Sequence, residues 1–137
     1  MAAMQEDFFA DAAMIGISTA AQGYRLCWLL NRHFDINFER DPDQNISSRK
    51  KDNEYYFPIY HCPFPNSNHK YSLYKLKNGT ETLLPEAKQL DYVWMVQTAS
   101  PELDAMDIVR ELRNIAEVQL ATVLAAEQLK NLSNLLT

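Results

Sequence analysis

Residues 84–96, Leu-Pro-Glu-Ala-Lys-Gln-Leu-Asp-Tyr-Val-Trp-Met-Val, constrain the fold of this chain more than any other stretch. Pro85 fixes its own φ and biases the residue before it toward extended geometry, which sets the chain direction ahead of a strand. Alternation places four side chains on one face of that strand: Leu90, Tyr92, Trp94 and Val96. Val93 and Met95 fall on the opposite face, and apolar residues on both faces are typical of a buried strand. We therefore predict a central strand over residues 90–97.

Two helices are predicted from apolar residues that recur at intervals of three and four. The first covers residues 20–33, with a capping box from Thr19 to Gln22 and a buried face that contains Trp28. The second covers residues 101–115, because Ser100-Pro101 supplies an N-cap and a proline at the first helical position. Its predicted buried face consists of Leu103, Met106, Val109, Leu112 and Ala116, bordered by Ile108 and Ile115.

Further strands are predicted from short apolar or alternating runs. They lie at residues 14–17, 36–40, 55–62, 71–77, 80–84 and 118–125. Pro58 favours an edge position or a bulge for the third of these strands, because proline cannot donate to a ladder. Asn78-Gly79 predicts a type I′ turn that folds 80–84 back on 71–77. Residues 41–54 are predicted to be a loop, and its basic cluster at 49–51 a solvated surface.

This order of elements, β-α-β, then a meander, then β-α-β, predicts an α+β fold. We expect an antiparallel sheet with two helices on one face. The ferredoxin-like, split-βαβ plan is one arrangement that fits this order, although periodicity does not determine which strands pair.

The chain has 137 residues, the ordinary size of a single domain with one core. We interpret residues 1–12 as a loosely ordered leader and residues 128–137 as an amphipathic tail. A net charge of −5 argues against a nucleic-acid partner. With neither a signal-peptide pattern nor the ~20 apolar residues that a membrane span requires, we expect a cytoplasmic protein with no membrane partner. Cys27 and Cys62 are then expected to be reduced.

Residues 84–92 resemble the motif that names the bacterial IPExxxVDY family, which has no established activity. Pro85, Glu86, Asp91 and Tyr92 match this motif at the right spacing, while leucine replaces its isoleucine at position 84 and its valine at position 90. Residues 24–31 are also similar to the early helix of that family, and the resemblance extends to the helix-then-strand ending. It implies a small cytosolic domain and no catalytic residue.

Glu86, Asp91 and Tyr92 are the first candidates for a functional site. The structural interpretation is a polar clasp in which the two carboxylates accept hydrogen bonds from turn amides and fix the path into the central strand. On this view Glu86→Ala or Asp91→Ala lowers stability by about 1 to 3 kcal/mol. The alternative is that these residues contact a ligand, or act as an acid and a base in a shared pocket.

Other chemistry finds less support in the sequence. His61, Cys62 and His69 could be imagined as zinc ligands, but a structural zinc site takes four ligands and a catalytic one three with an open position, and the sequence offers no convincing further Cys or His pair. A nucleophilic Cys62 would need an activating base and an oxyanion site that the sequence does not indicate. The three glycines do not form a phosphate-binding loop. We therefore predict no catalytic residue, no metal and no cofactor.

Our leading hypothesis is a non-enzymatic domain that binds a protein partner or a second copy of itself. It rests on aromatic and leucine-rich segments expected at the surface, notably five tyrosines and the tail: Tyr55, Tyr56, Tyr60, Tyr71, Tyr74 and residues 129–136. The alternative hypothesis is a regulatory domain that binds a small molecule near residues 84–92, by analogy with other ferredoxin-like sheets. An enzyme is the third possibility.

Overall fold

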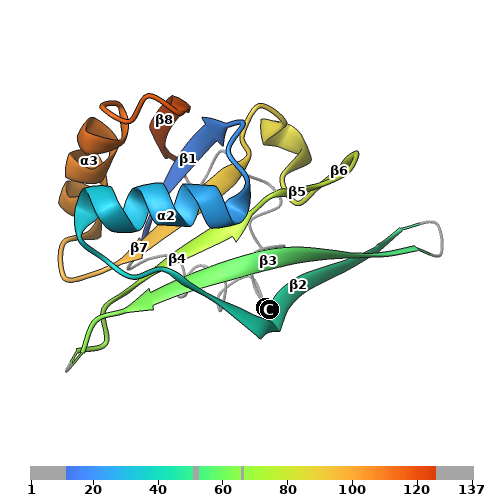
Figure 1. The fold of residues 1–137 in the computed structure, drawn as a ribbon, viewed down its shortest axis with the longest axis horizontal. Coiled ribbons are helices and arrows are strands. Elements are labelled where there is room, and N and C mark those ends of the chain that lie inside the picture. Colours follow the sequence, from blue (N-terminus) through green and yellow to red (C-terminus); the bar gives the residue numbers. More distant parts are fainter. Residues whose placement is uncertain (1–11, 51–52, 66, 126–137) are drawn as a thin grey trace.

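The computed structural model describes residues 12–50, 53–65 and 67–125, and these form an α+β fold (Figure 1). In chain order the elements are β1 (Ala13–Thr19), α2 (Gly23–Phe34), β2 (Glu39–Lys50), β3 (Asn53–Pro63), β4 (Lys70–Lys75), β5 (Lys77–Asn78), β6 (Glu81–Thr82), the 3₁₀ turn η1 (Pro85–Ala87), β7 (Tyr92–Gln97), α3 (Pro101–Leu112) and β8 (Val118–Leu124). The predicted leader, apart from Ala12, and the predicted tail lie outside the described residues.

Six strands form one sheet in the order β2-β3-β4-β7-β1-β8, and every neighbouring pair is antiparallel. This confirms the predicted α+β class and the interior position of residues 92–97. Strand β1 lies between β7 and β8, so the two crossover units interleave as they do in a split-βαβ sheet. Strands β2 and β3 extend the sheet beyond β4, and the ferredoxin-like plan remains an analogy.

The helices α2 and α3 cover one face of the sheet (Figure 1). On that face Trp94 is completely buried, and the rings of Phe34 and Phe38 pack edge-on against it with centroids 5.2 and 5.1 Å away. Such edge-to-face contacts are the geometry that aromatic quadrupoles favour. Trp94 therefore fills the centre of the helix-side core, as its place in the central strand predicts.

A second apolar cluster lies on the opposite face of the sheet. Val93 and Met95 contribute from β7, as alternation predicts, and η1 adds Ala87. Leu90 belongs to this second cluster, so its predicted place beside Trp94 is wrong. The reason is that β7 begins at Tyr92, and Leu90 still belongs to the turn, where its amide donates to the carbonyl of Ala87.

Residues 41–50 and 53–54 lie in strands rather than in the predicted loop, and residues 51–52 lie outside the described residues. Strands β2 and β3 pair along a hairpin that extends away from the rest of the sheet (Figure 1). The ladder is irregular between Arg40 and Asn45, which accommodates the proline at position 42. Pro58 lies opposite Asn45, at the end of this irregularity, and just beyond the last β3–β4 pair at Ile59. The predicted bulge is therefore close to Pro58. Strand β3 as a whole is not an edge strand, because β2 forms the edge, but at Pro58 it pairs with β2 and not with β4.

The Asn78-Gly79 turn forms, with a register one residue later than predicted. Asn78 pairs with Glu81, so Gly79 and Thr80 are the two central residues of the loop. Gly79 has a φ of 62° at the first of these positions, as in a type II′ turn, and Asn78 keeps a negative φ. The returning strand pairs with Lys77 and Asn78 rather than with β4, whose two sides are occupied by β3 and β7.

Both helices are shorter than predicted. Helix α2 begins at Gly23 after an N-cap, Gln22, that makes no side-chain capping bond, so the predicted capping box is wrong. Helix α3 begins at Pro101 as predicted and ends at Leu112.

The buried residues of α3 are Ala105, Ile108, Val109 and Leu112, whereas Leu103 and Met106 are exposed. Neither α-helix in the described part of the chain is long and apolar enough to span a membrane.

Candidate functional site

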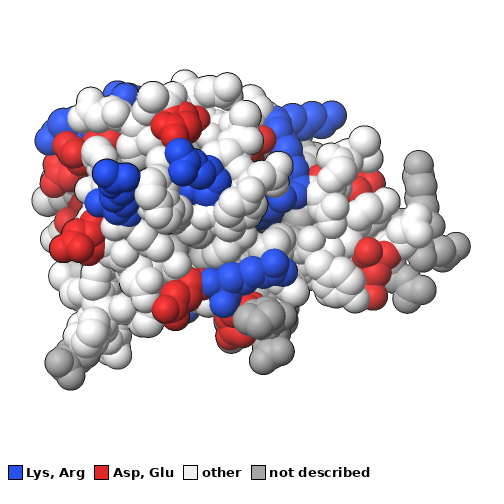
Figure 2. All heavy atoms as spheres, viewed as in Figure 1, with Lys and Arg blue, Asp and Glu red and all other residues white. Residues whose placement is uncertain are grey.

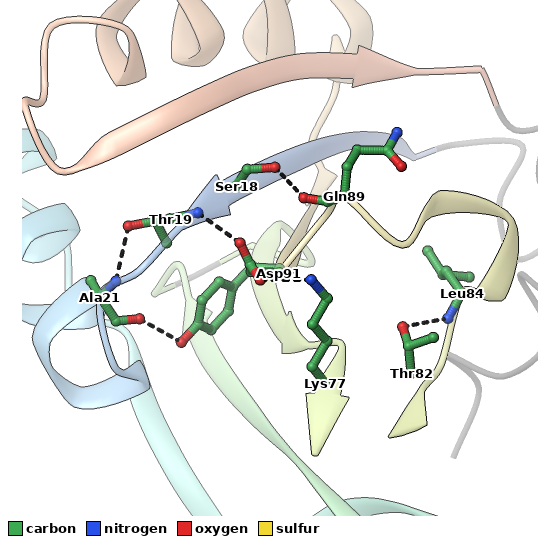
Figure 3. Close-up of polar contacts among 9 residues, drawn as sticks. Ser18, Thr19, Ala21, Lys77, Thr82, Leu84, Gln89 and Asp91 are labelled. Carbon is green, nitrogen blue, oxygen red and sulfur yellow. Dashed lines mark hydrogen bonds and ion pairs between the residues drawn. The ribbon is translucent and has the colours of Figure 1, made fainter. Parts of the chain in front are cut away.

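Asp91 lies where the end of β1, the segment that continues β4 and the start of β7 meet (Figure 3). Its amide donates to the carbonyl of Ile17 at 2.8 Å, and its carbonyl accepts from the amide of Leu76 at 2.9 Å. The backbone of Asp91 is thereby held between β1 and the segment that continues β4, one residue before β7 begins. The side chain is left to reach across the ends of the strands.

The two carboxylate oxygens of Asp91 have different partners. Oδ2 accepts from the backbone amide of Thr19 at 2.9 Å, and Oδ1 accepts from Nζ of Lys77 at 3.0 Å (Figure 3). The Asp91 side chain is 27% exposed, so the ion pair is partly shielded from solvent. Asp91 is therefore a clasp on a backbone amide, as predicted, and it joins the end of β1 to the residue that opens the β5–β6 hairpin.

Thr19 continues this network toward α2. Its hydroxyl donates to the carbonyl of Glu117 at 2.6 Å and accepts from the amide of Ala21 at 3.1 Å. The hydroxyl that we expected to cap the helix thus closes a short turn two residues long. It also ties β1 to the turn that precedes β8.

Tyr92 completes the network from the helix-side core. Its hydroxyl donates to the carbonyl of Ala21 at 3.1 Å. Burial raises the pKa of this phenol well above its ordinary value, with smaller contributions from Tyr60, Cys27 and Asp91. The phenol therefore stays protonated and remains a hydrogen-bond donor throughout the physiological pH range.

A cavity of about 240 Å³ opens beside this network. Its lining residues come from the β1–α2 turn and from the ends of β4, β5 and β7: Thr19, Ala20, Ala21, Gln22, Lys75, Lys77, Asp91 and Tyr92. Asp91 and Tyr92 are thus brought to a cavity, which a ligand contact would require. Lys75 and Lys77 are the residues that our sequence analysis missed, although alternation along 71–77 places Lys75 on the same face as Leu73.

The other two motif residues lie apart from the cavity. Pro85 and Glu86 are exposed residues of η1, and the cavity lining does not include them. The structure therefore does not bring Glu86 and Asp91 together as an acid–base pair. Because Glu86 is exposed, we now expect Glu86→Ala to lower stability by less than the sequence led us to predict.

A second surface feature is the outward side of α2. Tyr24 is 78% exposed and Trp28 is 47% exposed, so the predicted burial of Trp28 is wrong. The helix instead buries Leu26, Cys27 and Leu30, which lie on the opposite side of the turn. We define the α2 face as Tyr24, Arg25, Trp28 and Arg32.

Arginines flank Trp28 on this face. The guanidinium carbons of Arg25 and Arg32 lie 4.7 and 5.2 Å from the Trp28 ring centroid, which is cation–π geometry. Arg25 also pairs with Glu117 at 3.2 Å. A cavity of about 430 Å³ extends from Trp28 to the turn after α3 and is lined by Trp28, Leu29, Arg32, His33, Asn114, Ile115, Ala116 and Glu117.

The tyrosine-rich surface that we expected is largely absent from the described part of the chain. Tyr60 and Tyr74 are buried, Tyr55 and Tyr71 are partly buried, and Tyr56 alone of the five is exposed. Both thiols are buried and unbonded, and burial raises the pKa of Cys27 to about 12. Among the described residues, no three histidine, cysteine, aspartate or glutamate side chains gather to form a metal site.

Comparisons of this chain with protein-family models, with curated proteins and with solved structures found no match.

Proposed function

We propose that this chain is a non-enzymatic interaction domain that self-associates through the α2 face. The observation that carries the proposal is the exposure of Tyr24 and Trp28 on one side of a helix whose opposite side packs into the core. Tryptophan, tyrosine and arginine are the residue types most enriched among those that dominate binding energy at protein interfaces. The α2 face consists of these three types alone.

The charges around the α2 face favour a second copy as the partner. Arg25 lies beside Glu117, and His33 lies beside Glu111 at 3.1 Å, so basic and acidic groups alternate over a short distance. Figure 2 shows the same mixture of signs over the face of the molecule that carries α2. In a twofold dimer the same surface meets itself, and a surface with both signs can pair with itself without like-charge contact.

The resemblance of residues 84–92 to the IPExxxVDY motif supports a further proposal, that the chain is a cytoplasmic member of this bacterial family. Asp91 and Tyr92 give the two closing positions of that motif a shared role, because both fasten the turn between β1 and α2. This role is structural and is compatible with a domain that has no catalytic residue.

Sedimentation equilibrium on the full chain tests the self-association. We expect a particle of twice the 15.8 kDa chain mass at high protein concentration. Trp28→Glu places a carboxylate in the centre of the α2 face and is expected to shift the equilibrium to monomer. Tyr56→Glu makes the same change at an exposed aromatic residue on β3 and should leave the dimer intact. A wild-type chain that stays monomeric, or a dimer equally affected by both substitutions, would overturn the proposal.

A small-ligand regulatory domain is the second candidate, and one observation favours it. The cavity beside Asp91 lies at the motif segment where a ligand site was expected, with two lysines on its wall.

A further inference from the structure

We propose that the cavity lined by Lys75, Lys77 and Asp91 binds a small oxyanion, the carboxylate or phosphate group of a compact solute. This site is separate from the α2 face, so it does not depend on the self-association proposed above. The inference rests on the position of Lys75 and on the balance of charge around the cavity.

Lys75 occupies a position where an apolar residue would be expected. In the β4–β7 ladder it lies directly opposite Tyr92, and the preceding pair on the same face is Leu73 with Trp94. Those three partners are all buried on the helix side of the sheet. Lys75 is partly buried at the end of this row, where α2 has just begun and the cavity opens. A partly buried ammonium group at this place gains a charge-assisted partner if an anion occupies the cavity beside it.

Asp91 does not supply that anion. Its two oxygens are engaged by the Thr19 amide and by Lys77, so the one carboxylate on the cavity wall is paired with the other lysine. Among the described residues, Lys75 forms no ion pair with a protein carboxylate. The charged groups on the wall therefore sum to one net positive charge, which is located at Lys75.

The size of the cavity limits the ligand. A volume of about 240 Å³ lies below the roughly 300–1,000 Å³ of pockets that enclose drug-sized molecules. Gln22 also lines this cavity, and its side chain makes no helix-capping bond, so its amide can serve as a second donor. Lys75 and Gln22 can thus both donate hydrogen bonds to one carboxylate or phosphate group. The negative charge of Asp91 repels a second negative group on its side of the cavity.

Titration of the ¹⁵N-labelled full chain with sodium phosphate, and separately with sodium acetate, tests the site at constant ionic strength set with sodium chloride. We expect saturable amide shifts at Thr19, Gln22, Lys75 and Lys77. Saturation with phosphate, with acetate or with both supports the site and identifies the preferred class of anion. Lys75→Met keeps the aliphatic part of the side chain and should weaken binding about tenfold or more. Lys75→Arg keeps the positive charge and should retain most of the anion affinity.

Lys88→Met is the matched control, because it removes the same charge from an exposed residue outside the cavity. We expect it to bind the anion as the wild type does. Thermal unfolding of each variant shows whether the fold is retained, and Lys75→Arg keeps the test valid if Lys75→Met is destabilised. Shifts that fail to saturate with either anion, or equal weakening by the substitutions at positions 75 and 88, would overturn the proposal.

Discussion

Asp91 links three segments through one side chain, and the chain offers a direct comparison for it. Asp91→Ala removes the acceptor of the Thr19 amide and the partner of Lys77. We expect the free energy of unfolding to fall by about 1 to 3 kcal/mol, because a partly buried amide loses its hydrogen bond. Glu86→Ala, at the exposed motif carboxylate, should change it by less than about 1 kcal/mol. Chemical denaturation measures both values, and equal effects at the two positions would contradict the distinction.

Gly23 is required by a close approach of Tyr60. A Cβ atom at position 23 would lie 2.1 Å from the Tyr60 hydroxyl oxygen and 3.0 Å from the ring carbon that carries it. Gly23→Ala should therefore destabilise the chain by about 1 to 3 kcal/mol through overpacking, even though alanine favours helix.

A double-mutant cycle with Tyr60→Phe checks the cause of this loss. Removing the hydroxyl relieves the closest contact, so the double variant should be more stable than the sum of the two single losses predicts. Strict additivity in thermal or chemical unfolding would show that the Tyr60 hydroxyl is not the obstacle.

Among the elements, the β5–β6 hairpin depends on Gly79. This residue has a φ of 62°, and a Cβ atom added to it would meet no other atom within 4 Å, so only backbone conformation limits substitution. We expect Gly79→Ala to cost about 1 kcal/mol. Gly79→Asn should cost less, since asparagine tolerates positive φ better than other residues. Urea unfolding of the two variants measures this order, and a larger loss for asparagine than for alanine would contradict it.

Sequence periodicity located most elements and the two faces of the central strand, but not the buried faces of the helices. The central strand is evident because its residues are apolar on both sides, and Ser100-Pro101 marks the start of α3. The faces of the helices are harder to predict, because α2 contains apolar or aromatic residues around most of its circumference. Trp28 fits the predicted apolar stripe as well as the buried residues do. The side of α2 that is buried is determined by the packing of Leu26 and Leu30 against the sheet.

The long β2–β3 hairpin shows a second limit. Residues 41–50 contain a proline and several polar residues, which are typical of loops. They form a strand because β3 supplies a partner ladder, with the irregularity between Arg40 and Asn45 accommodating the proline. This information is non-local, so local composition could not provide it.

The candidate site likewise combines residues that the sequence reveals with residues that only the pairing of distant strands brings together. Asp91 and Tyr92 stand out in the sequence because they lie at the entry to a buried strand. Thr19 and Lys75 join them only through the pairing of β1 and β4 with β7, which sequence periodicity does not specify. Glu86 is a candidate because of its place in the motif, and its exposure on η1 could be determined only from the fold.

In the whole molecule, the helices have two distinct roles. Their inner sides bury the helix-side core around Trp94, while the outer side of α2 presents Tyr24 and Trp28. The chain therefore contains one tryptophan in the core and one on the proposed interface. Their exposures differ enough, 0% for Trp94 and 47% for Trp28, to serve as an internal reference and a probe.

Acrylamide quenching of tryptophan fluorescence tests the central claim, that the α2 face is covered by a second copy. Trp94 is completely buried inside the chain and Trp28 is 47% exposed, so we expect changes in quenching to report mainly on Trp28. We expect quenching of the wild-type chain to decrease as protein concentration rises, and to be independent of concentration in Tyr24→Glu, which keeps both tryptophans. Quenching of the wild type that stays the same from dilute to concentrated protein would contradict the account.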